Sequence, residues 1–265
     1  MNSKNQLKKR LKNGEIVFGP WCIIPSPTVT NIIATTGMDF VIFDLEHGSI
    51  SYETLENMIC SAESEDCCPL VRVGQRDELQ ILRSLDLGAH GVLVPHVQNK
   101  KEAEEAVSFI KYYPEGQRGF SPYTRAGGYS LIGVKDHAKN QNQQTLVALI
   151  LENKDCLDKI EEILDIRNVD LIYIGAYDLS QSLGVPGQLN NPKVRECVER
   201  SVRKIRDNGV AAGGYVAKNV EDIRWMTDIG MQFITYLPDV TTIFHSFHDA
   251  SNMFKSVIDK RIADI

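Results

Sequence analysis

The sequence has few of the features that would assign a protein to a class at once. In its 265 residues, no G-x-G-x-x-G or Walker motif follows an apolar run, so the usual signatures of nucleotide-binding domains are missing. No window approaches the length of a membrane span, and the basic stretch MNSKNQLKKRLKNGE has no apolar segment behind it. We therefore expect no signal peptide, no membrane anchor, a cytoplasmic location, and a short N-terminal surface helix that uses Leu7 and Leu11.

Positive charge and paired cysteines are also scarce. Lys and Arg number 29 against 35 Asp and Glu, which gives a net charge of −6 and argues against nucleic acid as the main partner. The six cysteines show no C-x-x-C spacing, and the adjacent Cys67 and Cys68 are poorly placed to bond to each other. We interpret the six as free thiols in a reducing compartment that behave as small buried apolar residues.

The sequence does contain a regular alternation of short apolar runs and longer amphipathic segments. The apolar runs are near-continuous, as expected of strands that are covered on both faces. Eight of them occupy residues 16–24, 39–44, 69–73, 91–97, 145–152, 170–175, 210–216 and 232–237. Eight strands that alternate with about eight helices predict an α/β fold, a single closed (β/α)8 TIM barrel over residues 1–265. An open doubly wound sheet is the alternative.

Helical patterns lie between these runs, and one long segment has no pattern at all. The helical patterns cover residues 52–64, 77–88, 101–113, 154–166 and 192–209. Gly88 and Gly209 stand where the C-terminal caps of two of these helices belong. The longest irregular stretch is 112–137, and a loop of this length on a barrel predicts a lid or a subunit contact.

The ends of the predicted strands are rich in polar residues, and barrel enzymes place their chemistry at the C-terminal strand ends. In chain order these ends carry Asp44, Glu46, His47, Arg72, His96, Glu152, Asp178, Tyr236 and Asp239. So much charge on one face is costly unless a counter-charge lies among it, and a divalent metal is an economical partner for two carboxylates. Glu152 and Asp178 come from neighbouring strands and suit two ligands of one octahedral ion, whose open positions would take water and a chelating substrate.

Other kinds of catalysis lack the residues they need. An imine-forming aldolase requires a lysine that faces the pocket, but Lys154 and Lys218 fall where helices begin, so we expect neither to point inward. No serine stands in a G-x-S-x-G elbow. Two carboxylates would also suit a glycosidase, yet sugar sites usually carry several aromatic side chains, and Trp21 and Trp225 have a structural interpretation here.

Each candidate residue also has a structural interpretation. His47 would cap the next helix, and Arg72 would pair with a helix acid if its side chain points outward. Glu152 would stabilise a helix N-terminus through the dipole, and Asp178 would be an N-cap. The arrival of all four at strand ends favours the functional interpretation, whereas His96 stands alone and is interpreted as structural.

Six motifs in chain order point to a known family. They are FDLEHG after the second strand, VRV in the third, LDLGAHGVLVPHVQN, YYPEGQRG, an acid that ends the fifth strand, and GAYDLSQSLG after the sixth. Together they span nearly the whole chain and resemble the HpcH/HpaI aldolase family, the metal-dependent class II pyruvate aldolases.

The resemblance implies an assembly, a cofactor and a role for each site residue. It implies a (β/α)8 barrel, usually a hexamer built as a trimer of dimers with the last helix exchanged between subunits. It implies Mg²⁺, Mn²⁺ or Co²⁺ held by Glu152 and Asp178 and chelated by pyruvate. Arg72 would steady the enolate, and His47 would act as the base through a metal-held water, with its basicity raised by Asp86. In a plain barrel Asp86 lies at a helix end that faces away from the catalytic rim, so its role rests on the resemblance alone.

The chain departs from the family pattern at two positions of the pyruvate pocket. Ile150 stands where well-studied members have a glutamine, and Tyr177 ends a Gly-Ala-Tyr sequence that is often Gly-Pro-Ala. Both changes bear on the identity of the substrate and leave the metal ligands and the base in place. We therefore expect Tyr177 to contact substrate together with Arg72 and Asp178, and Arg125 is a further candidate anion contact.

The sequence thus predicts a metal-dependent carbon–carbon lyase with small-molecule partners. It would cleave a 4-hydroxy-2-oxo acid to pyruvate, or a related 2-oxo acid, and an aldehyde, and would run in reverse. One alternative is a lyase of the same barrel type that acts on a thioester or a decarboxylation substrate, although no basic groove for a nucleotide end is evident. The other is a non-catalytic barrel that binds an oxo-acid, which Ile150 and Tyr177 keep open and the intact site argues against.

Overall fold

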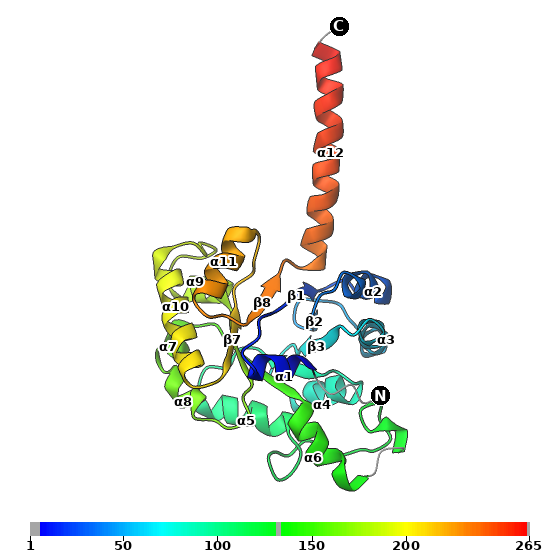
Figure 1. Cartoon of the computed structure of the whole chain (residues 1–265), viewed down its shortest axis with the longest axis vertical. Coiled ribbons are helices and arrows are strands. Elements are labelled where there is room, and N and C mark those ends of the chain that lie inside the picture. The colour runs from blue at the N-terminus through cyan, green and yellow to red at the C-terminus, as the bar shows by residue number, and fades with distance from the viewer. Residues whose placement is uncertain (1–5, 131–133, 264–265) are drawn as a thin grey trace.

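The computed structural model describes residues 6–130 and 134–263, and its centre is one closed barrel of eight parallel strands (Figure 1). Each strand pairs with the next along the chain, and β1 pairs with β8 to close the ring. The strands are β1 Val17–Cys22, β2 Phe40–Asp44, β3 Cys68–Arg72, β4 Gly91–Val94, β5 Leu146–Leu151, β6 Leu171–Ile174, β7 Ala211–Gly214 and β8 Phe233–Tyr236. All eight predicted strands are present, and the (β/α)8 prediction is confirmed over the open sheet.

Helices surround the barrel and connect successive strands (Figure 1). They are α1 Gln6–Lys12, α2 Pro27–Thr35, α3 Tyr52–Glu63, α4 Glu78–Asp86, α5 Lys100–Ile110, η1 Gly128–Ser130, α6 Val134–Gln144, α7 Lys154–Asp158, α8 Ile160–Leu164, α9 Ala176–Ser182, α10 Pro192–Asp207, α11 Val220–Asp228 and α12 Asp239–Ala263. Side-chain oxygens of Ser51, Asp77 and Asn219 accept backbone N–H bonds at the N-termini of α3, α4 and α11, which satisfies donors that a helix cannot pair internally. Gly88 and Gly209 have positive φ at the ends of α4 and α10, as predicted.

Alternate side chains of each strand point into the barrel and outward toward the helices. In β2, β3 and β5, the residues Phe40, Ile42, Leu70 and Ile150 belong to the cluster inside the barrel, while the residues between them pack under the helices. Successive side chains point to opposite faces of a strand, so a residue two positions after an inward-facing residue also faces inward. Those residues are Asp44, Arg72 and Glu152. The strand register therefore delivers them to the carboxyl-terminal mouth of the barrel.

The opposite end of the barrel interior is closed by apolar packing. Leu7 and Leu11 of α1 are buried and belong to the inner cluster, so this helix closes the barrel where a surface helix was predicted. Above it, the rings of Phe40 and Phe233 stack with centroids 4.0 Å apart. Gly19 allows this packing, because a Cβ at that position would lie 2.1 Å from the carbonyl oxygen of Phe40. The pocket is consequently confined to the other end.

Helix α12 leaves the barrel after β8 and projects away from it as a single rod (Figure 1). Asp239 at its start accepts hydrogen bonds from the backbone N–H groups of Ile23 and Ile24, both at 3.0 Å, which ties the helix to the end of β1. Further along, large apolar side chains are exposed, with Phe247 at 73% and Phe254 at 67% of their full accessible area. Such a surface is unusual on a chain that stays alone.

Some sequence-based expectations need refinement. The helical pattern at 154–166 divides into α7 and α8, and the irregular stretch 112–137 contains η1 and the first turn of α6, while 131–133 lie outside the described residues. All six cysteines are free, but Cys60 is exposed. Across the described ranges 6–130 and 134–263, no helix combines the length and the apolar character needed to cross a bilayer.

Candidate active site

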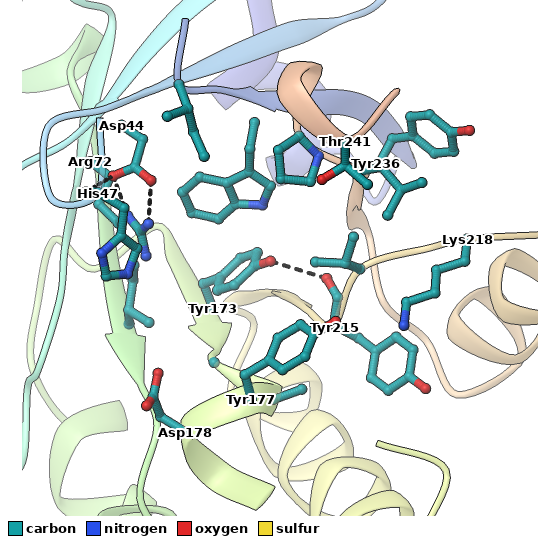
Figure 2. Close-up of a pocket in the computed structure, with 18 of the residues that line it drawn as sticks. Asp44, His47, Arg72, Tyr173, Tyr177, Asp178, Tyr215, Lys218, Tyr236 and Thr241 are labelled. Atoms are coloured by element: carbon teal, nitrogen blue, oxygen red, sulfur yellow. Dashed lines mark hydrogen bonds and ion pairs between the residues drawn. The ribbon is translucent and has the colours of Figure 1, made fainter. Parts of the chain in front are cut away.

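A pocket of about 770 Å³ opens at the carboxyl-terminal end of the barrel. It is lined from β1, β2, β3, β5 and β6, from the segments that follow β6, β7 and β8, and from the first turns of α12. Its walls include His47, Arg72, Glu152 and Asp178, which are predicted from strand ends, and also Tyr177, so the predicted residues meet in one cavity. Figure 2 draws most of these side chains around the open space.

Arg72 faces inward and is held by carboxylates. Its Nε donates to Asp44 at 2.9 Å, a second guanidinium nitrogen binds the other oxygen of Asp44, and Nη1 lies 3.2 Å from Glu46 (Figure 2). The guanidinium also lies over the ring of Trp21, 4.5 Å from its centroid. Burial acts against the charge of Arg72, but the hydrogen bonds and charge of Asp44 more than offset it, so the pKa of Arg72 is raised. This residue is a fixed cation in the wall of the pocket.

Asp44 also stabilises the turn that carries His47. Its Oδ1 accepts the backbone N–H groups of Glu46 and His47 at 3.0 and 3.2 Å. The side chain of His47 lies beside Arg72 and Asp44 in Figure 2. Ser51 caps α3, so the alternative interpretation of His47 as a helix cap is wrong.

Glu152 precedes α7 and points at the loop after β4. Its Oε1 accepts the backbone N–H of His96 at 2.9 Å and lies 2.5 Å from Nδ1 of the same residue. The other ring nitrogen of His96 contacts Glu46 at 2.8 Å, so a chain of polar contacts runs from Arg72 through Glu46 and His96 to Glu152. Asn153 caps α7, which excludes Glu152 as the first residue of that helix.

The charges around Glu152 favour its neutral form in the absence of a cation. Burial raises the pKa of Glu152, and the negative charges of Asp178 and Glu46 act in the same direction, while His96 partly offsets them. Asp178 lies in the first turn of α9, whose N-cap residue is Gly175, so the interpretation of Asp178 as an N-cap is wrong. Both carboxylates border the same cavity.

The residues present fit a divalent cation with oxygen ligands. Asp44, Glu152 and Asp178 line the pocket and Glu46 pairs with Arg72, so four carboxylates lie in or beside it together with Arg72 and Lys218. A cation would balance this excess of negative charge. A Cβ at position 175 would lie 2.9 Å from Oε2 of Glu152, and glycine keeps that space clear. Across the described parts of the chain, no group of three or more His, Cys, Asp or Glu side chains is arranged as a metal cage. Glu152 and Asp178 border one cavity and are the carboxylates that would hold such an ion.

Asp86 lies away from this constellation. It is the last residue of α4, its Oδ1 accepts a hydrogen bond from Arg118 at 2.7 Å, and it is not among the described residues that line the pocket. Arg125, the further candidate for an anion contact, pairs with Glu63 and donates to the carbonyl of Leu87. The role of Asp86 therefore stays a prediction, and Arg125 has a structural partner.

The two positions that depart from the family pattern both line the pocket, as expected. Ile150 is buried in the wall, and Tyr177 is half exposed within the opening (Figure 2). Trp21 also lines the pocket below Arg72, so its purely structural interpretation is wrong, whereas Trp225 packs against Arg195 and donates to Glu199. Several further aromatic side chains join Trp21 in the wall: Tyr173, Tyr215 and Tyr236.

Lys218 was expected to point away from the pocket, and that expectation is wrong. The residues between β7 and α11 stay close to the barrel, since the N–H of Ala217 donates to the carbonyl of Thr235 at 2.9 Å. This connection brings Lys218 to the rim, where it lines the pocket. Lys154 does point away, since it pairs with Asp158 on α7.

Some of the site residues could be recognised from the residue pattern, and others could not. Asp44 could have been recognised as an inward carboxylate from the period of β2, because Phe40, Ile42 and Asp44 share one face. His96 adopts a positive φ of 57°, which turns its ring toward Glu46 and Glu152. Sequence patterns do not reveal such a backbone reversal at a residue other than glycine.

Comparison with known proteins extends over most of the chain. The family model described as HpcH/HpaI aldolase/citrate lyase matches residues 18–246. A pyruvate aldolase from Rhizobium etli is 35% identical over 79% of this chain and 82% of its own length. The crystal structure of a citrate synthase is 32% identical and covers 96% of this chain and 98% of its own, with a TM-score of 0.86. An HpcH/HpaI aldolase from Desulfitobacterium hafniense is 28% identical, with a TM-score of 0.89 over 94% of this chain and 96% of its own.

Proposed function

Because the chain belongs to the HpcH/HpaI aldolase/citrate lyase family, we propose that it is a metal-dependent aldolase that uses pyruvate or a closely related 2-oxo acid. It is a carbon–carbon lyase of the pyruvate aldolase type. In the cleavage direction, a 4-hydroxy-2-oxo acid would give the 2-oxo acid and an aldehyde. The observation that carries the proposal is the convergence of His47, Arg72, Glu152 and Asp178 on one pocket.

The bond changes of this reaction are simple to balance. The 4-hydroxyl group loses its proton, the bond between C3 and C4 breaks, and the aldehyde departs. The electron pair of that bond passes to the 2-oxo oxygen as an enolate, and a proton added at C3 then gives the methyl group of pyruvate. An enzyme for this reaction needs a proton carrier and positive charge at the enolate oxygen.

The residues of this pocket match those needs. Arg72 is a fixed cation that burial and Asp44 hold in one orientation, which suits it to stabilise the enolate oxygen. His47 borders the same space and can accept or return a proton. Glu152 and Asp178 would hold Mg²⁺, Mn²⁺ or Co²⁺, and the ion would supply Lewis acidity toward the keto oxygen. Tyr177 and Ile150 would contact the donor and set its size.

The test is exchange of the pyruvate methyl protons with deuterium, followed by NMR, because it requires no knowledge of the aldehyde. We expect exchange with Mg²⁺ or Mn²⁺ and its loss with EDTA, since enolate formation would depend on the cation. His47→Ala should lower the exchange rate at least ~100-fold, in the range lost with a general base. Exchange that persists in EDTA or in the His47→Ala variant would contradict the proposal.

Other features of the family resemblance remain predictions for this chain. We expect a homo-oligomer, a hexamer with α12 exchanged between subunits, because the exposed apolar side chains of α12 require a partner. Asp86 would raise the basicity of His47, although its partner within the chain is Arg118. A cytoplasmic location is expected from the sequence features described above.

A second candidate is a related carbon–carbon lyase that uses a thioester. The observation that favours it is the similarity to a citrate synthase, whose 32% identity is close to the 35% of the pyruvate aldolase. If that reaction is the true one, pyruvate methyl exchange should be absent with every metal, and an acyl thioester should release free thiol only when an oxo-acid acceptor is present.

A further inference from the structure

We propose that the acceptor aldehyde carries an anionic group, a carboxylate or a phosphate, and that Lys218 binds this group at the far end of the pocket. The inference rests on the proposed aldolase function and extends it to the second substrate. It makes Lys218 a residue that determines specificity.

The pocket has two ends with different chemistry (Figure 2). His47, Arg72 and Asp178 lie together on one side, where the donor would bind, and Lys218 lies across the cavity from them. The ring of Tyr177 stands between the two sides, and the ring of Tyr215 lies on the side of Lys218. At about 770 Å³, the cavity falls in the range that holds drug-sized ligands and greatly exceeds the needs of a three-carbon oxo-acid. There is room for an acceptor of several carbons that reaches Lys218.

The charge of Lys218 is available to a ligand. Its side chain is exposed, and its Nζ lies 5.9 Å from the ring centroid of Tyr177. Among the residues that the structure describes, no carboxylate oxygen lies within ion-pair distance of this Nζ. Arg72, by contrast, is occupied by Asp44 and Glu46. An anion that enters the far end would therefore meet a cation without competition from the protein.

The backbone at Lys218 is anchored, although its side chain is exposed. The N–H of Lys218 donates to Asp222 Oδ2 at 3.0 Å, and Asn219 caps α11 through the N–H of Asp222 at 2.9 Å. Ala217 forms a bridge with Tyr236, next to the end of β8. The backbone of Lys218 is thus fixed relative to the barrel. A residue that selects acceptors by length needs such a fixed position.

The groups around Lys218 suit an anion rather than a second cation or an apolar tail. Thr241, from the first turn of α12, brings a hydroxyl group to the lining, and Tyr236 adds a phenol ring. The hydroxyl of Thr242 already donates to the carbonyl of Pro238 at 3.2 Å. Hydroxyl and ammonium groups are hydrogen-bond donors to carboxylate and phosphate oxygens. The aromatic rings in the middle of the pocket would contact the carbon chain that links the aldehyde to its anionic group.

The experiment compares matched acceptor aldehydes with pyruvate as donor. One pair is butyraldehyde and succinic semialdehyde, and the other is glyceraldehyde and glyceraldehyde 3-phosphate. We expect the anionic member of one pair to have the higher kcat/KM, and the pair that shows the preference identifies carboxylate or phosphate. In Lys218→Met this preference should fall roughly 10- to 100-fold, mainly through KM of the aldehyde, as expected for a lost hydrogen bond between charged groups.

Two further variants test whether the change in preference is due to the loss of the charge at position 218. Lys193→Met removes the same charge from the exposed start of α10 and should keep the wild-type preference, while Lys218→Arg should restore part of it. A preference that survives in Lys218→Met, or a wild type that does not distinguish the paired aldehydes, would overturn the inference.

Failure of the proposed function gives a different result. Wild-type protein that exchanges no pyruvate protons would contradict the aldolase function, and the Lys218 site is then tested by calorimetry without metal. Succinate or inorganic phosphate should bind the wild type roughly 10-fold or more tightly than Lys218→Met. Equal binding to both proteins would overturn the inference in that case as well.

Discussion

At the scale of single residues, the pocket depends on a carboxylate that takes no part in the proposed proton transfer. Asp44 is 1% exposed and accepts four hydrogen bonds, two from Arg72 and two from backbone N–H groups. It holds the guanidinium of Arg72 and the turn that carries His47 at the same time. Loss of this one side chain would release both.

We predict that Asp44→Ala lowers the free energy of unfolding by about 3 kcal/mol, because it leaves the buried guanidinium of Arg72 without its main partner. Urea denaturation measures this change. Asp178→Ala is a matched control, since it removes a carboxylate from the same pocket at an exposed position and should change stability by less than ~0.5 kcal/mol. Equal effects of the two substitutions would contradict the structural role of Asp44.

The same scale shows how far a sequence can predict a site. Arg72 and Glu152 continue the inner face of their strands, so the period of the strand places them once the barrel is known. Lys218 and His96 lie outside regular strands, and their side-chain directions depend on a bridge at Ala217 and on a positive φ at His96. These are tertiary and backbone features that the residue pattern does not encode. Sequence reasoning therefore assigned Lys218 wrongly, and it gave no indication that His96 contacts Glu46 and Glu152.

At the scale of elements, α12 differs from every other described helix in having a long part that does not cover the barrel (Figure 1). Five of its exposed apolar residues recur at helical spacing and form one stripe: Val240, Ile243, Phe247, Phe254 and Val257. Phe244 and Met253 are also exposed and flank this stripe. A stripe of this kind on a rod would bind a second copy of the chain. The exchange of this helix between subunits was predicted only through the family resemblance. An apolar stripe in the sequence does not distinguish a helix that packs on its own barrel from a helix that packs on a second subunit.

We predict that the double variant Phe247→Glu and Phe254→Glu shifts the protein to a smaller oligomer, because two buried charges would oppose the interface. Light scattering coupled to size-exclusion chromatography gives the mass of each species. Asn252→Glu lies on the opposite side of α12 by helical spacing and should leave the mass unchanged. A wild type that is monomeric at all concentrations would refute the assembly prediction directly.

At the scale of the whole molecule, the barrel contains a buried lysine that links stability to pH. Lys111 is 1% exposed at the end of α5, and its Nζ donates to the carbonyls of Asn142 and Thr145 at 2.6 and 3.1 Å. Burial lowers the pKa of Lys111 to about 8, and the charge of Lys8 acts in the same direction. The unfolded chain has the ordinary lysine pKa near ~10.4 and so binds more protons between these two values.

This difference sets the sign of the pH effect. Where the unfolded state binds more protons, the free energy of unfolding rises with pH, so the contribution of Lys111 should grow by about 2 kcal/mol between pH 8 and 9.5. The measurement is the difference in unfolding free energy between the wild type and Lys111→Met across this range, which subtracts all other titrating groups. Parallel curves for the two proteins would mean that Lys111 titrates normally in the folded state.

The barrel itself was predictable from the sequence, for a physical reason. Strands covered on both faces become continuous apolar runs, and their alternation with amphipathic helices leaves few topologies open. The register of β2, β3 and β5 then brings Asp44, Arg72 and Glu152 to one rim. By contrast, the burial of α1 inside the barrel end depends on a cavity that exists only in the closed fold, so Leu7 and Leu11 could be identified as apolar anchors but not located.

Helix α12 is attached to the barrel at its N-terminal end alone among the described contacts. It is clamped at Asp239, and Thr241, Thr242 and His245 near the clamp form part of the pocket wall. About 27 Å of helix extends beyond His245, given a rise of ~1.5 Å per residue. A small tilt at the free end would therefore turn the wall of the pocket about the clamp. A partner that held the tip of α12 would therefore also hold the part of the pocket wall that α12 contributes.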